Sequence, residues 1–448
     1  MTIAPPDHPG VGYRPARDGR WLIDGAVGCY DRGGRAVEGR AELVVRDGFI
    51  ERLAPVAADE QNRGSSGLIL VPLFVNAHDH GRGTGNVAAG IPDGPLEEWI
   101  ESLRRHRGSS QEALVGDGCD LMLASGVGAS VLCVNPQTTD TRSEVVAAAG
   151  AALDRGVRAA IVYPIADAMG SLYGRGRDDS GWDAGEVARR LDEVEQIAAK
   201  LDDPRLEVQL GPVGPQWVSE PTLRAVGQHA ARTGRRVHMH LLESPAQRAW
   251  ADTTYPEGIV RFLARAGLTG PRVCFAHGTQ LRVDEIGALA EGGGTLAVNV
   301  SSNLRLCSGI PPLAAAREVG LPLGAGLDGL ALGDDGDYWA ELRLLRGLEQ
   351  AQTGRTVDAS ALIERVVDGG CRAVGGCAPA RPAEGAYADF QLIDIAGYEH
   401  LLSAGWTAAD VALAIGRPAR VAEVWVGGYR AYRHPPGPAA PSPRRGPG

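Results

Sequence analysis

Lysine is almost absent from this sequence of 448 residues. Lys200 is the only one, and arginine supplies the rest of the 45 basic side chains. Acidic side chains number 55, so the formal net charge is −10. Binding to nucleic acid without regard to sequence depends on an excess of basic surface, which this composition does not offer. We therefore expect a protein that binds no nucleic acid.

The sequence also lacks the marks of membrane insertion, export and disulfide bonding. No apolar run is long enough to span a bilayer, and the first twenty residues, rich in proline and glycine, do not resemble a signal peptide. Seven cysteines are dispersed without a CxxC pair, which is typical of reduced thiols. We expect a cytoplasmic protein that does not partner a membrane.

Strand-length apolar runs alternate with segments of helical periodicity from residue 69 onward. The runs are almost continuously apolar, as expected for strands covered on both faces. Repeated strand–helix units of this kind predict an α/β fold of the (β/α)₈ barrel type. An open doubly wound sheet is the alternative, and it is disfavoured because no GxGxxG or GxxxxGK[ST] motif follows a strand. The eight predicted strands are 68–78, 129–136, 158–167, 206–214, 236–243, 273–281, 295–302 and 321–329.

Shorter runs typical of antiparallel strands precede and follow the predicted barrel. We expect both ends of the chain to meet in one small β-sandwich. The predicted limits are 1–68 and 384–434 for the two parts of the sandwich and 69–383 for the barrel. The remaining residues, 435–448, are rich in proline and glycine and are expected to be disordered.

Histidines and acids stand at the carboxyl ends of four predicted strands, where barrel enzymes place their active sites. His78 and His80 are two residues apart, so in a strand both side chains point to the same side. Neutral imidazole is a common ligand of Zn²⁺ and Fe²⁺. A hydrogen-bonded core pair is the alternative for these two residues, and a helix cap is the alternative for Glu243. The other candidates are His238, His240, His277 and Asp328.

Several segments together resemble the amidohydrolase superfamily, and most closely its aminohydrolase branch, which contains S-adenosylhomocysteine and guanine deaminases and triazine hydrolases. They are "VNAHDH", "GPLEEWI", "HMHLLES", "AHGTQL", "SSNLRLCSGIPPL", "GLDG" and "GAYADFQLIDI". The resemblance implies a metal site formed by His78, His80, His240 and Asp328. It implies Glu243 as the catalytic acid, His277 as a contact to water or substrate, and Asp328 also as a base. It leaves the role of His238 open and suggests a homo-oligomer.

The scarcity of lysine bears on the number of metal ions. Members of the superfamily with two ions bridge them by a carboxylated lysine on the fourth barrel strand. The predicted fourth strand, 206–214, contains no lysine, and Lys200 belongs to the preceding helix. We therefore expect one divalent ion, with zinc favoured over iron.

The resemblance, together with these residues, implies a hydrolase that deaminates an amino-substituted nitrogen heterocycle or cyclic amidine. The metal ion would activate water for attack on an sp² carbon, Glu243 would protonate the adjacent ring nitrogen, and Asp328 would pass a proton to the departing ammonia. One alternative is that the same site releases a substituted amine or a halide, or opens a cyclic amide as imidazolonepropionases do. Another is a non-catalytic metal-binding scaffold, which would not need a proton relay.

Contacts to a small-molecule substrate are expected from loops at the same face of the barrel. A guanidinium could bind a carboxylate or phosphate, or serve only as a structural ion-pair partner. An aromatic side chain could form a wall for a planar ring, or simply pack within its loop. The candidates are Arg82, Trp99, Gln216, Trp217, Asn303 and Arg305.

Overall fold

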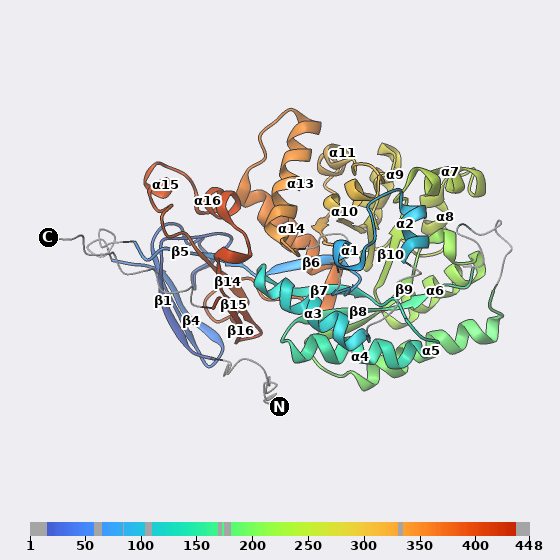
Figure 1. Ribbon diagram of the computed structural model, residues 1–448, viewed down its shortest axis with the longest axis horizontal. Coiled ribbons are helices and arrows are strands. Elements are labelled where there is room, and N and C mark those ends of the chain that lie inside the picture. Colours follow the sequence, from blue (N-terminus) through green and yellow to red (C-terminus); the bar gives the residue numbers. More distant parts are fainter. Residues whose placement is uncertain are drawn as a thin grey trace.

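The protein consists of a barrel and a smaller β-sandwich lying side by side (Figure 1). The computed structural model describes residues 16–57, 65–83, 85–103, 110–168, 173, 181–329 and 335–435. The predicted disordered tail therefore lies outside the described residues from 436 onward. No helix in the described ranges combines the length and the apolar character needed to cross a membrane.

Eight parallel strands form the barrel, which confirms the predicted (β/α)₈ fold. Each strand pairs with the next one along the chain, so all carboxyl ends reach the same face. The strands are β6 (Phe74–Asp79), β7 (Val127–Cys133), β8 (Arg158–Ile165), β9 (Leu206–Pro212), β10 (Val237–Leu241), β11 (Val273–His277), β12 (Thr295–Val298) and β13 (Leu323–Ala325).

Helices surround the barrel, and their starts follow from capping side chains. Ser219, for example, accepts a hydrogen bond from the backbone N–H of Thr222, and Pro221 stands in the first turn of α6. The helices are α1 (Asn86–Ala89), α2 (Leu96–Leu103), α3 (Gln111–Ala124), α4 (Thr141–Asp154), α5 (Ala184–Lys200), α6 (Glu220–Thr233), α7 (Pro245–Thr254), α8 (Ile259–Arg265), α9 (Val283–Gly292), α10 (Val300–Arg305), α11 (Leu313–Glu318), α13 (Tyr338–Thr353) and α14 (Ala359–Val374).

The β-sandwich is built from both ends of the described chain, as the sequence predicts (Figure 1). Strands β1 (Gly19–Ile23), β3 (Ala41–Arg46) and β4 (Phe49–Pro55) form one sheet. The other sheet has the order β16 (Tyr429–Arg433), β15 (Val421–Val426), β14 (Phe390–Asp394), β5 (Leu68–Pro72) and β2 (Gly25–Ala26). Helices α15 (His400–Ser403) and α16 (Ala408–Ile415) connect β14 to β15. Phe390 and Trp425 stack in the core with ring centroids 5.7 Å apart.

The run predicted as one strand over 68–78 is two strands. Its first half, β5, pairs with β14 in the sandwich, and its second half, β6, pairs with β7 in the barrel. The chain changes sheets at Leu73, just after Pro72, which has no N–H to donate to a continuing ladder. The sandwich thus takes a strand from the range predicted for the barrel, while the exact domain limits stay a prediction.

The barrel closes at a seam between its first and last strands, β6 and β13. In the described ranges these two strands share no regular ladder, and individual contacts join them. The backbone N–H of Asp328 donates to the carbonyl oxygen of His78 at 3.0 Å. The hydroxyl of Tyr338 lies 2.9 Å from the carbonyl oxygen of Val75 and 3.1 Å from that of Ala325. The seam therefore runs directly beneath two of the predicted metal ligands.

Candidate metal centre

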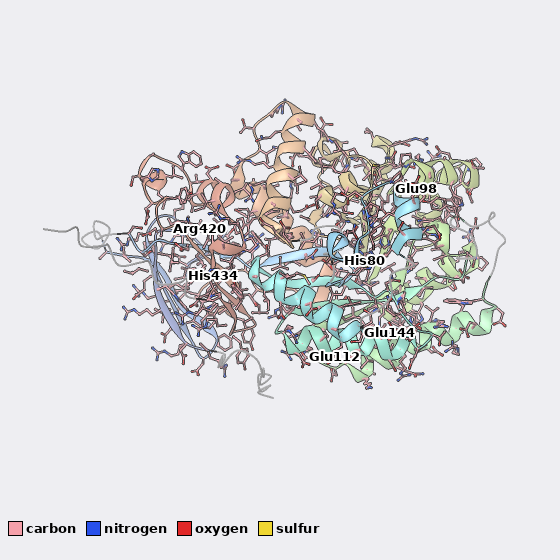
Figure 2. The ribbon with its side chains drawn as sticks, viewed as in Figure 1. His80, Glu98, Glu112, Glu144, Arg420 and His434 are labelled. Carbon is pink, nitrogen blue, oxygen red and sulfur yellow. The ribbon has the colours of Figure 1, made fainter. Side chains whose placement is uncertain are left out.

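Three imidazoles and one carboxylate converge at the carboxyl ends of β6, β10 and β13. His78 Nε2 and His80 Nε2 lie 3.1 and 3.4 Å from the same atom, Asp328 Oδ1. His240 Nε2 lies 3.2 Å from His80 Nε2. The structure thus brings together the four residues predicted as metal ligands. In Figure 2, His80 lies in the barrel half of the molecule, whereas Arg420 and His434 lie in the sandwich.

The donor atoms are arranged to bind a cation rather than to form hydrogen bonds with one another. His78 Nε2 and Asp328 Oδ1 are buried, and neither is in hydrogen-bonding geometry with any described residue. Buried polar atoms are normally paired, so a site that leaves a nitrogen and a carboxylate oxygen unpaired side by side implies a missing partner. Imidazole nitrogens with one carboxylate oxygen form a donor set suited to zinc or iron. The residues present therefore fit a divalent ion.

Burial keeps these histidines neutral, which is the form that binds a metal. Desolvation, followed by the neighbouring His240 and His238, holds the pKa of His78 well below its ordinary value. Desolvation and the positive charge of Arg82 do the same to the pKa of His80. Burial, assisted by His277, lowers the pKa of His240 to about 4. The Nδ1 atom of His240 lies 2.7 Å from the carbonyl oxygen of Val213. The ring proton of His240 is therefore on Nδ1, and its Nε2 is unprotonated.

Asp328 is held as a carboxylate by its surroundings. Burial opposes its ionisation, but interactions with His277 and His80 and a hydrogen bond from Ser302 outweigh burial, so the pKa of Asp328 is lowered. The Ser302 hydroxyl donates to Oδ2 at 2.6 Å, which leaves Oδ1 for the histidines. Asp328 has a backbone φ of +63°, which lies in the left-handed region that residues other than glycine seldom adopt. Such strain is typical of residues held in place for function.

Glu243 and His277 lie close to each other beside this centre. Glu243 follows β10 and is 3% exposed, and its Oε2 lies 3.7 Å from His277 Nε2. Burial raises the pKa of Glu243 to about 7. A carboxyl group with this pKa can both give and take a proton near neutral pH. His277 Nδ1 lies 2.9 Å from Asn303 Oδ1 and 3.2 Å from Asn299 Nδ2, and its Nε2 faces Glu243.

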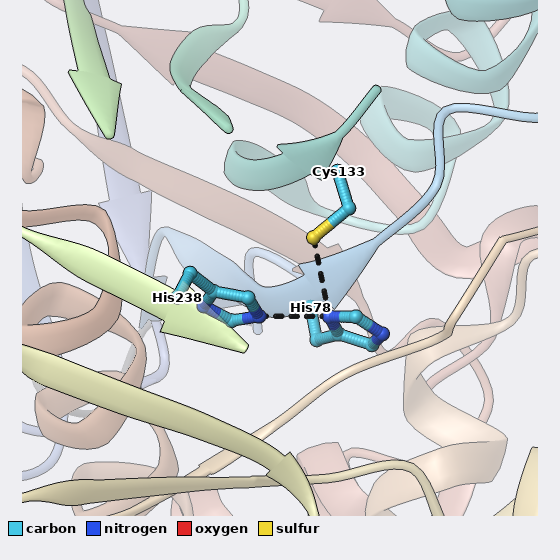
Figure 3. Close-up of side chains that lie close together, drawn as sticks. All are labelled: His78, Cys133 and His238. Atoms are coloured by element: carbon cyan, nitrogen blue, oxygen red, sulfur yellow. Dashed lines mark hydrogen bonds between the residues drawn. The ribbon is translucent and has the colours of Figure 1, made fainter. Parts of the chain in front are cut away.

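A second set of contacts lies one layer deeper in the barrel, behind His78 (Figure 3). His78 Nδ1 is 2.9 Å from His238 Nε2 and 3.6 Å from Cys133 Sγ. His238 and His240 alternate with Met239 on β10, so both point inward from the same strand. The sequence left the role of His238 open, and the structure places it against a predicted ligand.

Two of the predicted substrate contacts lie against each other. The guanidinium carbon of Arg82 is 5.7 Å from the ring centroid of Trp99, a distance at which a cation and an aromatic ring attract. Trp99 is buried in a small apolar cluster with Leu96 and Leu306. Both residues stay predictions as substrate contacts.

The remaining predicted contacts have partners within the protein. Trp217 stacks on Tyr173 with ring centroids 6.2 Å apart, in the 3₁₀ turn η1 (Pro215–Trp217) that also contains the buried Gln216. Asn303 contacts His277 as described above, and Arg305 forms an ion pair with Asp93 at 2.8 Å. These pairings do not test the predicted contacts to substrate, which stay predictions.

Several residues near the centre were not predicted from the sequence. Ser302, which bonds Asp328, and Cys133, which contacts His78, are examples. Glu97 is another: it accepts a hydrogen bond from Ser244 at 2.5 Å and one from Tyr173. The "SSNLRL" and "PLEEWI" segments that contain Ser302 and Glu97 were recognised as motifs, so those motifs were the available clue. Cys133 offered no clue beyond its place near the end of a strand.

Comparison with known proteins identifies the family. The model of the amidohydrolase family matches residues 69–429, and the chain belongs to this family. It is 29% identical over 322 residues to a 5-methylthioadenosine/S-adenosylhomocysteine deaminase of Teredinibacter turnerae, covering 69% of this chain and 67% of that protein. It is 28% identical over 331 residues to an 8-oxoguanine deaminase of Pseudomonas aeruginosa, covering 70% of this chain and 72% of that protein.

A solved structure extends the likeness to the whole fold. The crystal structure of an adenosine deaminase from Xanthomonas campestris with bound zinc aligns with a TM-score of 0.71 at 25% identity. The alignment covers 91% of this chain and 92% of that one. The resemblance inferred from the sequence motifs is therefore confirmed at the level of family and fold.

Proposed function

We propose that this protein is a metal-dependent aminohydrolase that removes an amino group, as ammonia, from a nitrogen heterocycle or cyclic amidine. The observation that carries the proposal is the convergence of His78, His80, His240 and Asp328 on one point, with Glu243 and His277 beside it. A scaffold that only bound a metal would have no use for a buried acid that lies beside the proposed ligands and faces His277.

The centre is proposed to hold one ion, zinc in preference to iron. Strand β9, the fourth strand of the barrel, contains no lysine that could bridge a second ion. The zinc-containing adenosine deaminase structure shares the fold, and the imidazole and carboxylate donors suit zinc. When bound, the ion acts as a Lewis acid that makes water a nucleophile at neutral pH.

The chain's own residues then have separate roles. Asp328 keeps its oxygen Oδ1 at the meeting point of the histidines and accepts a proton from the attacking water. Glu243 delivers its proton to the ring nitrogen next to the attacked carbon, so that negative charge does not build up there. His277 faces Glu243 with its Nε2 and orients the water and the substrate. Asp328 finally passes its proton to the departing amine, and the proton of the added hydroxyl returns to Glu243 as the carbonyl group forms.

The substrate is proposed to be a planar, amino-substituted ring, as the names of the related deaminases suggest. Trp99 and Trp217 are the aromatic side chains proposed to flank it, and Arg82, Gln216, Asn303 and Arg305 the polar ones. The oligomeric state predicted from the resemblance is a further proposal, which gel filtration with light scattering would test.

Ammonia release tests this function. The zinc-loaded protein would be assayed against purines, purine nucleosides, pyrimidines, triazines and pterins that have an exocyclic amine. We expect turnover of at least one amine and loss of that turnover in Glu243→Gln. Chloro-substituted and N-alkylated analogues of the same rings separate the alternative leaving groups. Release of chloride or alkylamine without ammonia would contradict deamination, and zinc binding without any turnover would favour the scaffold.

A further inference from the structure

His78 uses its two ring nitrogens in opposite directions. Nε2 faces Asp328 Oδ1 at 3.1 Å, on the side of the metal centre. Nδ1 faces the barrel interior, where His238 Nε2 lies at 2.9 Å and Cys133 Sγ at 3.6 Å (Figure 3). His78 is completely buried, so no solvent reaches either atom. What Nδ1 meets therefore decides which nitrogen is free to bind an ion.

The protons on these rings can be assigned by counting. A neutral imidazole has one N–H, and the nitrogen that binds a metal must be bare. If Nε2 of His78 binds the ion, Nδ1 holds the proton and needs an acceptor. His238 Nε2 is the near atom that can serve, because a thiol is a weak acceptor and lies farther away. The two ring planes are inclined by only 8°, which lets the N–H point at the in-plane lone pair of His238.

We propose that His238 is a positioning residue that accepts the Nδ1–H of His78 and so fixes the tautomer that presents Nε2 to the metal. This inference rests on the proposed function, because it needs His78 to be a ligand. Ligating histidines usually donate their second N–H to a carboxylate or a backbone carbonyl. Here a neutral imidazole replaces that partner.

The proposed role leaves the other ring nitrogen of His238 in an unfavourable position, which packing alone would not select. If its Nε2 accepts, its proton lies on Nδ1, and that atom is buried without a hydrogen-bond partner among the described residues. An unpaired N–H inside a protein is unfavourable. Packing alone would favour an apolar side chain at this position, as at Val75, Ala129 and Val131 on other strands of the barrel. The contact of His238 Nε2 with His78 Nδ1 explains why a histidine occupies this position.

The same three side chains could instead hold a second ion, since His78, Cys133 and His238 offer donor atoms within 4.8 Å of one another. That alternative requires the opposite state of one atom. A second ion needs a bare Nδ1 on His78, whereas the proposal needs a protonated one. The proposal and the second-ion alternative therefore differ in whether His78 Nδ1 holds a proton, which can be measured.

Three variants isolate the hydrogen bond. His238→Leu removes the acceptor, and His238→Gln keeps one on a side chain of similar reach. Cys133→Ala is the matched control, because it removes the other neighbour of the same nitrogen from the same interior layer. Thermal unfolding of the metal-free proteins establishes that each variant folds.

Metal affinity and spectroscopy are the readouts, independent of turnover. We expect His238→Leu to weaken zinc binding in chelator competition by roughly 10–100-fold, the usual effect of losing a partner of a ligating histidine. His238→Gln should recover most of that affinity, and Cys133→Ala should bind zinc like the wild type. The visible spectrum of the cobalt-substituted protein should change in His238→Leu and not in Cys133→Ala.

The ¹⁵N spectrum of histidine-labelled, zinc-loaded wild type gives a test that needs no variant. We expect a proton on Nδ1 of His78, and a bare Nδ1 would overturn the proposal even if His238→Leu fails to fold. Unchanged zinc affinity in a folded His238→Leu would also overturn it, as would two zinc ions per wild-type chain of which Cys133→Ala loses one. A wild type that binds no zinc would instead refute the proposed function.

Discussion

Replacing Glu243 with glutamine removes one transferable proton and little else. The side chain is 3% exposed, and its Oε2 lies 3.7 Å from His277 Nε2. Its backbone N–H donates to Gln247 Oε1 at 2.8 Å, a bond that the substitution leaves in place. Glutamine has the same shape as glutamate but cannot deliver a proton to a ring nitrogen. None of the four proposed metal ligands is altered.

The expected loss can be estimated from the role. Proton transfer by a positioned side chain contributes about 10²–10⁴-fold to a rate, which corresponds to about 3–5 kcal/mol of transition-state stabilisation. The decrease should fall on kcat, because the proton moves after the substrate has bound. Zinc content should stay that of the wild type.

Initial rates of ammonia release, measured beside zinc analysis of the same samples, check both expectations. Glu341→Gln is the matched control. Glu341 is also buried with a pKa raised by burial to about 7, but its carboxylate accepts from the backbone N–H of Ser301, and it forms no ion pair with His277 in the described part of the chain. We expect this variant to keep its kcat. A Glu243→Gln protein with wild-type kcat, or one that has lost its zinc, would refute the assigned role.

Three further predictions follow from contacts around the centre. Ser302→Ala removes a hydrogen bond to the buried carboxylate of Asp328, which costs about 1.5–3 kcal/mol. We therefore expect zinc binding, measured by chelator competition, to weaken about 10–100-fold. A variant that binds zinc as tightly as the wild type would contradict this role of Ser302. Removing zinc should lower the melting temperature, because zinc at 1,000 times its Kd stabilises the folded state by about 4 kcal/mol; an unchanged melting temperature after chelation would contradict a built site. Glu341 has a folded pKa of about 7 against an ordinary 4.5, so the folded state binds the extra proton between these values and wild-type stability falls as pH rises through them. Unfolding of Glu341→Gln beside wild type should therefore favour the variant increasingly from pH 5 to pH 8, by up to about 3 kcal/mol, and a constant difference would contradict the shift.

The barrel and the convergence of the candidate ligands were predictable because they follow from local rules. Alternation of apolar strands with helical segments defines the fold class, and parallel strands place all their carboxyl ends on one face. His78 and His80 share a side because a strand repeats every two residues. The choice of His240 over His238, however, came from the resemblance, since periodicity alone places both on the same side.

The rest depends on contacts between distant parts of the chain. The switch of sheets at Leu73 is invisible in a run that stays apolar throughout, because both sheets bury it. Ser302 reaches Asp328 only because α10 follows β12 at the edge of the site. His238 reaches His78 across the barrel interior from a strand that is not its neighbour in the sheet. No spacing rule within a single segment encodes such pairs.

The seam of the barrel connects folding with the metal centre. The proposed ligands His78 and Asp328 lie at the carboxyl ends of the two strands that close the cylinder, and the N–H of Asp328 donates to the carbonyl oxygen of His78. Asn76 continues this link, since its Oδ1 accepts from Leu327 N–H at 3.0 Å while its Nδ2 donates to Asp79 Oδ2 at 2.7 Å. The site therefore forms only when the first and last strands have met. An ion held by His78 and Asp328 would strengthen this closure, for which the backbone supplies few hydrogen bonds because no regular ladder joins β6 and β13 in the described ranges.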